Sequence, residues 1–156
     1  MEREALLQAV TAHFPDAQPV VTEPATQLPE VKVPREKFRA LMEWLHDGEL
    51  ALDFPMCMTA VDWPEINKIT CVYHLYSMAH KHKLVVKVDA DREAPNVPTV
   101  SDLWEGCNWL EREVFDLFGV TFQDHPDLRR IMLTDDWVGF PLRKDYKDSR
   151  IAGKPY

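Results

Sequence analysis

WLEREVFDLFGVTFQDHPDLRRIMLTDDWVGFPLRKDY, residues 109–146, is the stretch around which the chain is organised. Its first residues complete a helix predicted over residues 103–118, because a turn of about 100° per residue brings six apolar side chains onto one arc. Gly119 is expected to end this helix. The six apolar residues are Leu103, Cys107, Leu110, Val114, Leu117 and Phe118.

The charged side chains of this helix divide between two faces. Arg112 and Asp116 lie opposite the apolar arc and stand four residues apart, so they are expected to pair on the solvent or partner side. Glu111 falls on the apolar arc, where an unpaired carboxylate would be costly or would stay protonated. Glu111 is therefore expected to have a cationic or hydrogen-bonding partner, with Arg129 and Arg130 as the first candidates.

Beyond Gly119 the chain loses its periodicity and becomes nearly neutral. Residues 119–156 contain seven Lys and Arg against six Asp, whereas the whole chain has a formal net charge of −8. Apolar side chains recur there without a helical or strand period, and Pro126 and Pro141 force their predecessors out of helix. Such a segment cannot build its own core. Two interpretations stay open: a loop folded back over the body, and an arm laid along another protein.

Two blocks of residues in this stretch resemble a family signature. The first block is Glu111-Arg112-Glu113, Asp116 with two apolar residues after it, His125, and Arg129-Arg130-Ile131-Met132; the second is Trp137, Gly139 and Pro141-Leu142-Arg143-Lys144-Asp145-Tyr146. Together they resemble the C subunit, or 30 kilodalton subunit, of proton-pumping NADH:quinone oxidoreductase, respiratory complex I. Asp124 stands where that family commonly has Gly, and Val138 and Phe140 stand where Glu and His are frequent.

The resemblance implies a cofactor-free structural subunit of the peripheral arm of that complex. Electrons would pass from NADH through FMN and iron–sulfur clusters held by other subunits to quinone, coupled to proton translocation. The implied partner is the hydrogenase-like large (D) subunit, and contact with the cytoplasmic side of the inner membrane would come only through the complex. An equivalent subunit of a membrane-bound hydrogenase, or of another quinone-reducing complex, is the alternative. The expected partner-binding residues are Glu111, Arg112, Glu113, Asp116, His125, Arg129, Arg130, Trp137, Phe140, Arg143, Lys144 and Tyr146.

The rest of the chain predicts an α+β fold. The expected elements are a helix over residues 2–13, strands at Gln18–Glu23 and Pro29–Val33, a helix from Pro34 to Gly48, a strand within Leu50–Trp63 broken at Pro55, a hairpin over residues 68–89, a charged loop over residues 89–98, and Thr99 or Ser101 as the cap of the helix that follows. This order indicates a two-layer single domain with a mixed, largely antiparallel sheet packed by helices. The body is expected over residues 1–118 and the arm over 119–156.

Composition argues against several classes of function. The negative charge is unsuited to nucleic acid and to anionic lipid, and no apolar run approaches the length of a membrane span, so a cytosolic location is the default expectation. Cys57, Cys71 and Cys107 form no CxxC pair, so they are expected to be reduced and buried rather than ligands. His80 and His82, two residues apart, could bind a metal ion, but a solvated turn is the favoured interpretation.

A freestanding small hydrolase that uses His125 and an acidic partner is the remaining alternative. The glycines are isolated, so no phosphate-binding loop is encoded, and no nucleophile lies in an elbow. A His-Pro-Asp sequence on an irregular segment is more typical of a turn whose imidazole bonds the backbone. The sequence therefore favours a binding subunit without catalytic residues.

Overall fold

A long antiparallel hairpin forms the centre of the structure, a computed structural model that describes residues 2–20 and 28–148. The five-stranded sheet has the order β1-β2-β5-β4-β3, in which only the β2–β5 pair is parallel. The elements are α1 (Arg3–His13), β1 (Gln18–Pro19), β2 (Glu30–Val33), α2 (Arg35–Asp47), β3 (Phe54–Trp63), a 3-10 turn (Pro64–Ile66), β4 (Lys68–Tyr76), β5 (Lys83–Asp91), β6 (Asn96–Pro98), α3 (Glu105–Phe118) and β7 (Thr121–Gln123). The predicted α+β fold with a mixed sheet is confirmed.

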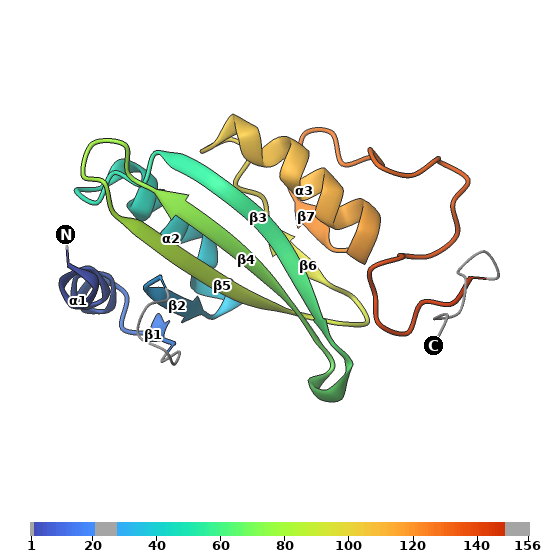
Figure 1. Cartoon of the computed structure of the whole chain (residues 1–156), viewed down its shortest axis with the longest axis horizontal. Coiled ribbons are helices and arrows are strands. Elements are labelled where there is room, and N and C mark those ends of the chain that lie inside the picture. The colour runs from blue at the N-terminus through green and yellow to red at the C-terminus, as the bar shows by residue number, and fades with distance from the viewer. Residues whose placement is uncertain (1, 21–27, 149–156) are drawn as a thin grey trace, which may run out of the picture.

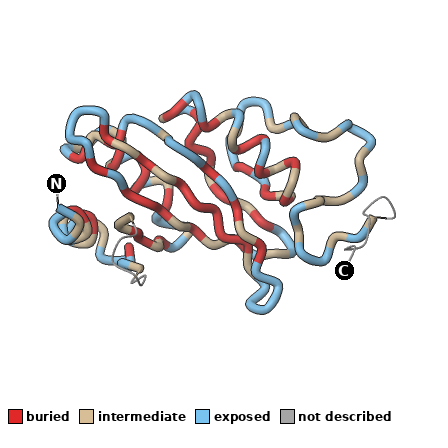
Figure 2. The backbone as a smooth tube through the Cα atoms, viewed as in Figure 1, coloured by how far each residue is buried: buried red, intermediate tan, exposed pale blue. Residues whose placement is uncertain are grey.

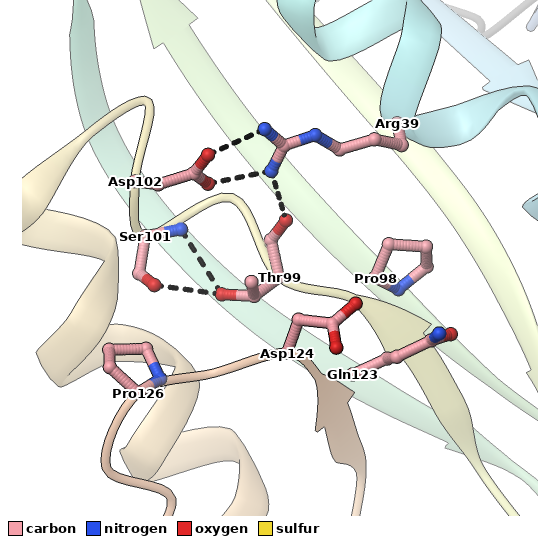
Figure 3. Close-up of a pocket in the computed structure, with 8 residues that line it drawn as sticks. All are labelled: Arg39, Pro98, Thr99, Ser101, Asp102, Gln123, Asp124 and Pro126. Carbon is pink, nitrogen blue, oxygen red and sulfur yellow. Dashed lines mark hydrogen bonds and ion pairs between the residues drawn. The ribbon is translucent and has the colours of Figure 1, made fainter.

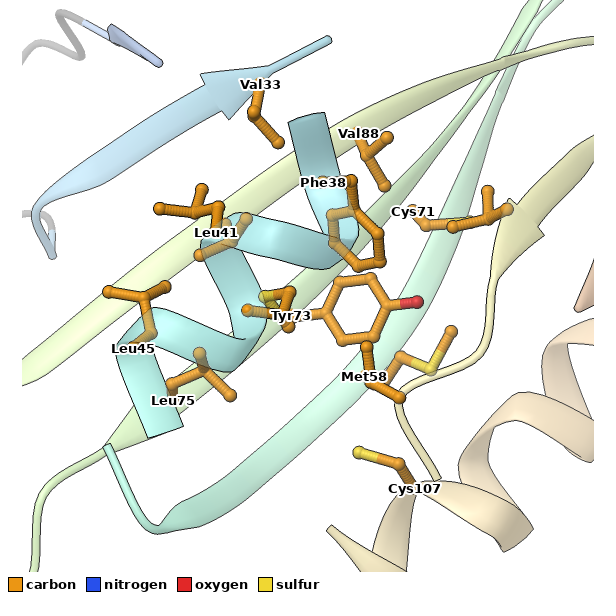
Figure 4. Close-up of a cluster of buried hydrophobic side chains, with 14 of the residues drawn as sticks. Val33, Phe38, Leu41, Leu45, Met58, Cys71, Tyr73, Leu75, Val88 and Cys107 are labelled. Atoms are coloured by element: carbon orange, nitrogen blue, oxygen red, sulfur yellow. The ribbon is translucent and has the colours of Figure 1, made fainter. Parts of the chain in front are cut away.

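The main core lies between α2 and one face of the β4–β5 hairpin. Alternate residues of the strands point to this face, as the period of 2 predicts, and Tyr73 pairs in register with Val86. Phe38 of α2 lies over Tyr73 with 5.2 Å between the ring centroids, and Leu41 and Leu45 extend the contact along the helix (Figure 4). All five side chains are buried, so this layer is closed to solvent.

Helix α3 packs against β3 and places the candidate site at the far end of the sheet from α1 (Figure 1). Cys107, Val114 and Phe118 are buried as the apolar arc predicts, and Gly119 ends the helix with a left-handed φ of 76°. The prediction that Thr99 or Ser101 caps the helix is wrong, because Trp104 occupies that position.

Several boundaries differ from the sequence-based expectation. Pro34 is the N-cap of α2 rather than its first residue, and β3 runs through Pro55, with a register irregularity after it. Proline is tolerated there because β3 is an edge strand and Pro55 lies next to its register irregularity, two places where strands accept a residue without an N–H. Cys57 is exposed rather than buried. Of the strand predicted over residues 18–23, β1 covers the first two residues, and residues 21–23 lie outside the described part.

Two short strands were missed by the sequence analysis. β6 lies inside the predicted loop and β7 inside the predicted arm, and they pair in parallel with Val97 opposite Phe122. Three-residue strands carry too little alternation to be recognised. β7 therefore attaches the first residues after Gly119 to the body, and the irregular segment begins at Asp124. In the described parts of the chain, no helix has both the length and the apolar character needed to cross a membrane.

Candidate partner-binding site

Residues 124–148, the irregular and described part of the predicted arm, keep the name arm from here on. This segment runs along the side of α3 that faces away from the sheet and is mostly exposed or half-buried (Figures 1 and 2). It contains no helix or strand, so its backbone groups need partners other than a ladder. The body supplies these partners chiefly through two buried carboxylates, one from α3 and one from β3.

Asp116 is the carboxylate on α3, and its side chain is fully buried. Its Oδ2 accepts the backbone N–H groups of Ile131, Met132 and Leu133 at 3.0, 2.7 and 2.9 Å, while Oδ1 accepts from Arg130 Nη1 at 2.6 Å. Burial by itself would raise the pKa of Asp116, but these donors outweigh it and the pKa is lowered. An ionised Asp116 therefore fixes three consecutive arm residues.

Two arginines complete this attachment. Arg130 continues from Asp116 to the carbonyl of Trp137, which lies 3.1 Å from its Nη2. Arg112 donates from Nε to the carbonyl of Arg129 at 3.2 Å, and its guanidinium lies over the ring of Trp109. The expected surface pair of Arg112 with Asp116 is therefore wrong: both residues are buried beneath the arm, and each binds the arm instead of the other.

Asp62 on β3 is the second buried carboxylate. It accepts two bonds from Arg92, at 2.6 and 3.0 Å, and the backbone N–H of Lys144 at 2.8 Å. The hydrogen bonds from Arg92 are the main reason that the pKa of Asp62 is lowered. Arg92 also binds Asp145 at 2.7 Å, and the ammonium of Lys144 lies 5.2 Å from the ring centre of Trp63.

Two glycines with left-handed φ values make room for the aromatic rings of the arm. A Cβ on Gly119 would lie 2.5 Å from the ring of Phe140, and one on Gly139 would lie 2.8 Å from the ring of Tyr146. Arg143 lies over the Phe140 ring and donates from Nε to the carbonyl of Phe118 at 2.7 Å. These aromatic side chains pack on the chain itself and are only partly open to a partner.

Glu111 is fully buried, as expected, and it has hydrogen-bonding partners. Thr99 Oγ1 donates to one carboxylate oxygen, and the backbone N–H of Val100 donates to the other at 2.8 Å. The suggested partners Arg129 and Arg130 are wrong, because the arm passes on the Asp116 side of α3. Burial raises the pKa of Glu111 to about 7, although the bonds from Thr99 and Val100 oppose the rise.

Thr99 and Ser101 form one wall of a pocket of ≈ 590 Å³ between α2 and the start of the arm (Figure 3). Arg39 of α2 closes another side through a two-fold ion pair with Asp102, with 2.6 Å in each contact. Asp124, in the left-handed region with φ 63°, also lines the pocket and lies below Thr99 in this view. The left-handed backbone explains why the family that the sequence resembles commonly has glycine at this position.

His125 is not placed as a catalytic base. Its side chain is fully buried, and its Nε2 lies 3.3 Å from the carbonyl of Asn108 while its Nδ1 accepts the N–H of Asp127 at 3.0 Å. The imidazole therefore bonds the backbone, as the turn interpretation predicts. Burial lowers the pKa of His125.

The sequence analysis missed the most exposed apolar side chains around α3 and the arm. Those in the arm were missed because single apolar residues in an irregular segment show no period, and the one on α3, Trp109, was missed because it lies off the apolar arc. They are Trp109, Met132, Val138 and Leu142, with exposed fractions of 59, 62, 85 and 51%. Among the predicted site residues, Glu113 is exposed, and Arg129 is 72% exposed and bound to Asp127.

The family model described as "Respiratory-chain NADH dehydrogenase, 30 Kd subunit" matches residues 31–150 of the chain. The chain belongs to this family. It is the C subunit of the peripheral arm of NADH:quinone oxidoreductase, complex I. The C subunit of the NADH-quinone oxidoreductase of Moorella thermoacetica is 42% identical over 148 residues, which cover 95% of this chain and 97% of that protein.

Two further comparisons with this C subunit bear on its partner and its fold. The C/D subunit of the NADH-quinone oxidoreductase of Phocaeicola vulgatus is 43% identical over 120 residues, which are 76% of this chain and 23% of that protein. The solved trypsin-resistant fragment 1–134 of Nqo5 superposes with a TM-score of 0.68 at 30% identity, over 81% of this chain and all of that one. The fold is therefore the Nqo5-like fold.

Proposed function

We propose that the arm and the outer side of α3 form the surface through which this C subunit binds the large D-type subunit of the complex. The backbone of the arm is held by hydrogen bonds to the body of the same chain, through Asp116, Asp62 and their arginines. The arm thus presents a preformed surface, and little ordering would be needed on binding.

The observation that carries this proposal is the exposure of large apolar side chains on a segment whose backbone is fixed. Met132, Val138 and Leu142 point away from a body that binds the adjacent backbone, and Trp109 of α3 lies exposed beside Arg112. Exposed apolar and aromatic residues on a fixed backbone are typical of the core of an interface.

The C/D relative supports the D subunit as the partner. Its name joins the two subunits, and this chain matches only about a quarter of it, so the matching part is one portion of a longer chain. When two proteins occur fused in a relative, their separate forms commonly bind one another. The arm also offers cationic groups, Lys144 and the exposed Arg129, for acidic residues of a partner.

The proposed role is structural, with no cofactor held by this chain and with the cytoplasmic face of the membrane reached only through the complex. Within residues 2–20 and 28–148, no three His, Cys, Asp or Glu side chains are grouped so that they could hold a metal ion. FMN and iron–sulfur clusters would then belong to other subunits.

Co-purification of the full chain with the co-expressed large subunit tests the surface. Met132→Asp should lower affinity at least tenfold, since a carboxylate placed in an apolar interface loses burial and remains without a partner. Met78→Asp is the matched control, because Met78 is 52% exposed but lies in the turn between β4 and β5, at the other end of the sheet. Equal affinities for the two variants would show that the arm is not the contact.

A further inference from the structure

Two ionisable side chains that no role above uses lie together beneath the start of the arm. Glu111 and His125 have fully buried side chains, and Nε2 of His125 lies 3.8 Å from Oε2 of Glu111. A buried carboxylate next to an imidazolium would be an ordinary ion pair. The protonation state of His125 therefore decides whether Glu111 is ionised beside a cation or protonated beside a neutral ring.

The hydrogen bonds of His125 select the neutral imidazole. Asp127 donates its backbone N–H to Nδ1, so Nδ1 carries no proton, and Nε2 is left to donate to the carbonyl of Asn108. A protonated ring would be a donor at both nitrogens and would lose the bond from Asp127. Burial and the nearby Arg112 also disfavour the cation, and they outweigh the Asn108 carbonyl and the Asp127 carboxylate, which favour it, so the pKa of His125 is lowered.

Glu111 can keep its hydrogen bonds whether or not it carries a proton. Thr99 Oγ1 lies between a carboxyl oxygen of Glu111 and Ser101 Oγ, and its distance to Ser101 Oγ is 2.8 Å. Thr99 Oγ1 also accepts the backbone N–H of Ser101. When the carboxyl is protonated it donates to Thr99, which donates to Ser101. When the carboxyl is ionised, both hydroxyls reverse their direction: Ser101 donates to Thr99, and Thr99 donates to Glu111. Thr99 and Ser101 also line the pocket beside Arg39 and Asp102 (Figure 3).

We propose that Glu111 is a proton-binding site of the folded chain, which keeps its proton beside a neutral His125 and exchanges it with water in the pocket through Thr99 and Ser101. On release the proton passes to Thr99, the hydroxyl proton of Thr99 passes to Ser101, and that of Ser101 passes to a water molecule. No side chain other than Glu111 changes its charge.

The other charged and titratable groups around Glu111 are few. Asp102 disfavours its ionisation and Arg39 favours it, and these two are bound to one another. Tyr73 and Cys71 on β4 and Cys107 one turn earlier on α3 have pKa values raised first by burial, so they stay neutral. With no free cation among these neighbours, burial dominates, and the pKa of Glu111 lies at about 7.

Carbon-13 NMR of the side-chain carboxyls of the full chain tests the site, with the Glu111 signal assigned by its loss in Glu111→Gln. The signal should titrate with a midpoint near pH 7, and the imidazole nitrogens of His125 should show the Nε2–H tautomer throughout. A Glu111 midpoint below pH 6, or a protonated His125 ring at that pH, would overturn the proposal.

Two further variants separate the contribution of the Thr99 hydroxyl from that of burial alone. Thr99→Val removes the hydroxyl at nearly the same volume. It should move the Glu111 midpoint upward by about one pH unit, since the bond that Thr99 makes to the ionised carboxylate is stronger than the bond it makes to the neutral form. Glu113→Gln, two residues further along α3 and exposed, should leave the midpoint unchanged. An unchanged midpoint in Thr99→Val would contradict the role of Thr99.

Discussion

The body and the arm are stabilised by different physics. The body buries a continuous layer of apolar side chains between α2 and the sheet, where each residue contributes through the area it removes from water. The arm buries little of its own and is held by charge-assisted hydrogen bonds to Asp116 and Asp62. Many small contributions make the body tolerant of single polar changes at its surface, whereas a few carboxylates decide whether the arm is attached.

The largest effect is expected for Asp116→Ala, which breaks the attachment of the arm. It removes four hydrogen bonds and leaves Arg130 without its carboxylate, and such a loss typically costs about 3–5 kcal/mol. Amide exchange of Ile131, Met132 and Leu133 should become fast, while that of β4 stays slow. Hydrogen exchange read residue by residue measures both.

Leu45→Ala is the matched change in the body. The loss of its buried side chain should lower the free energy of unfolding by about 2–5 kcal/mol and speed exchange in every element at once. If Asp116→Ala instead lowered protection across the whole sheet as Leu45→Ala does, the arm and the body would be one cooperative unit.

The buried carboxylates should have opposite effects on the pH dependence of stability: Glu111 lowers stability as pH rises, and Asp116 and Asp62 raise it. Because the pKa of Glu111 is raised from 4.5 to about 7, its contribution to stability is complete below about pH 4.5 and is lost as pH rises through 7, by about 3 kcal/mol in all. Asp116 and Asp62 have lowered pKa values, so they contribute above about pH 4 and lose that contribution in acid.

Urea unfolding of the wild type and of Glu111→Gln between about pH 2 and 8 measures this prediction, since the acid decline lies below the ordinary pKa of an aspartate. The glutamine variant should lose the decline between pH 4.5 and 7 but keep the decline in acid. A variant with the same profile as the wild type would mean that Glu111 has the same pKa in the folded and unfolded states.

A smaller effect is expected where the arm meets the end of α3. Gly119→Ala should destabilise by about 1–2 kcal/mol, since alanine is strained at φ 76° and its Cβ would overlap the Phe140 ring. Gly106→Ala is the control, because its Cβ would meet only Pro55 at 3.9 Å and alanine favours helix. Thermal unfolding compares the two variants, and similar losses would rule out the ring contact as the cause.

The smallest effect is expected at Asp124, the left-handed residue that opens the arm. Asp124→Gly should change stability by less than about 0.5 kcal/mol, because relief of the φ of 63° is offset by the greater freedom of glycine in the unfolded chain. Asp124→Val should cost about 1–2 kcal/mol, because a β-branched residue is disfavoured there. Equal stabilities of the valine and glycine variants would show that the backbone strain is negligible.

The sequence by itself determined the elements whose pattern is local. The helix ending at Gly119, the β4–β5 hairpin and the burial of Glu111 follow from periods of 3.6 and 2, which depend only on neighbours along the chain. The signature residues were also sufficient to predict the family, since they can be recognised without any fold.

Only the tertiary structure decided what covers the second face of α3. A helical pattern that assigns polar residues to solvent cannot anticipate that Arg112 and Asp116 are buried by an aperiodic segment, nor that Arg130 binds Asp116 rather than Glu111. The pairing of β6 with β7 and the placing of Thr99 on Glu111 likewise join residues distant in the chain. Such contacts depend on the path that the chain takes after each turn, and the local pattern of residue types does not specify that path.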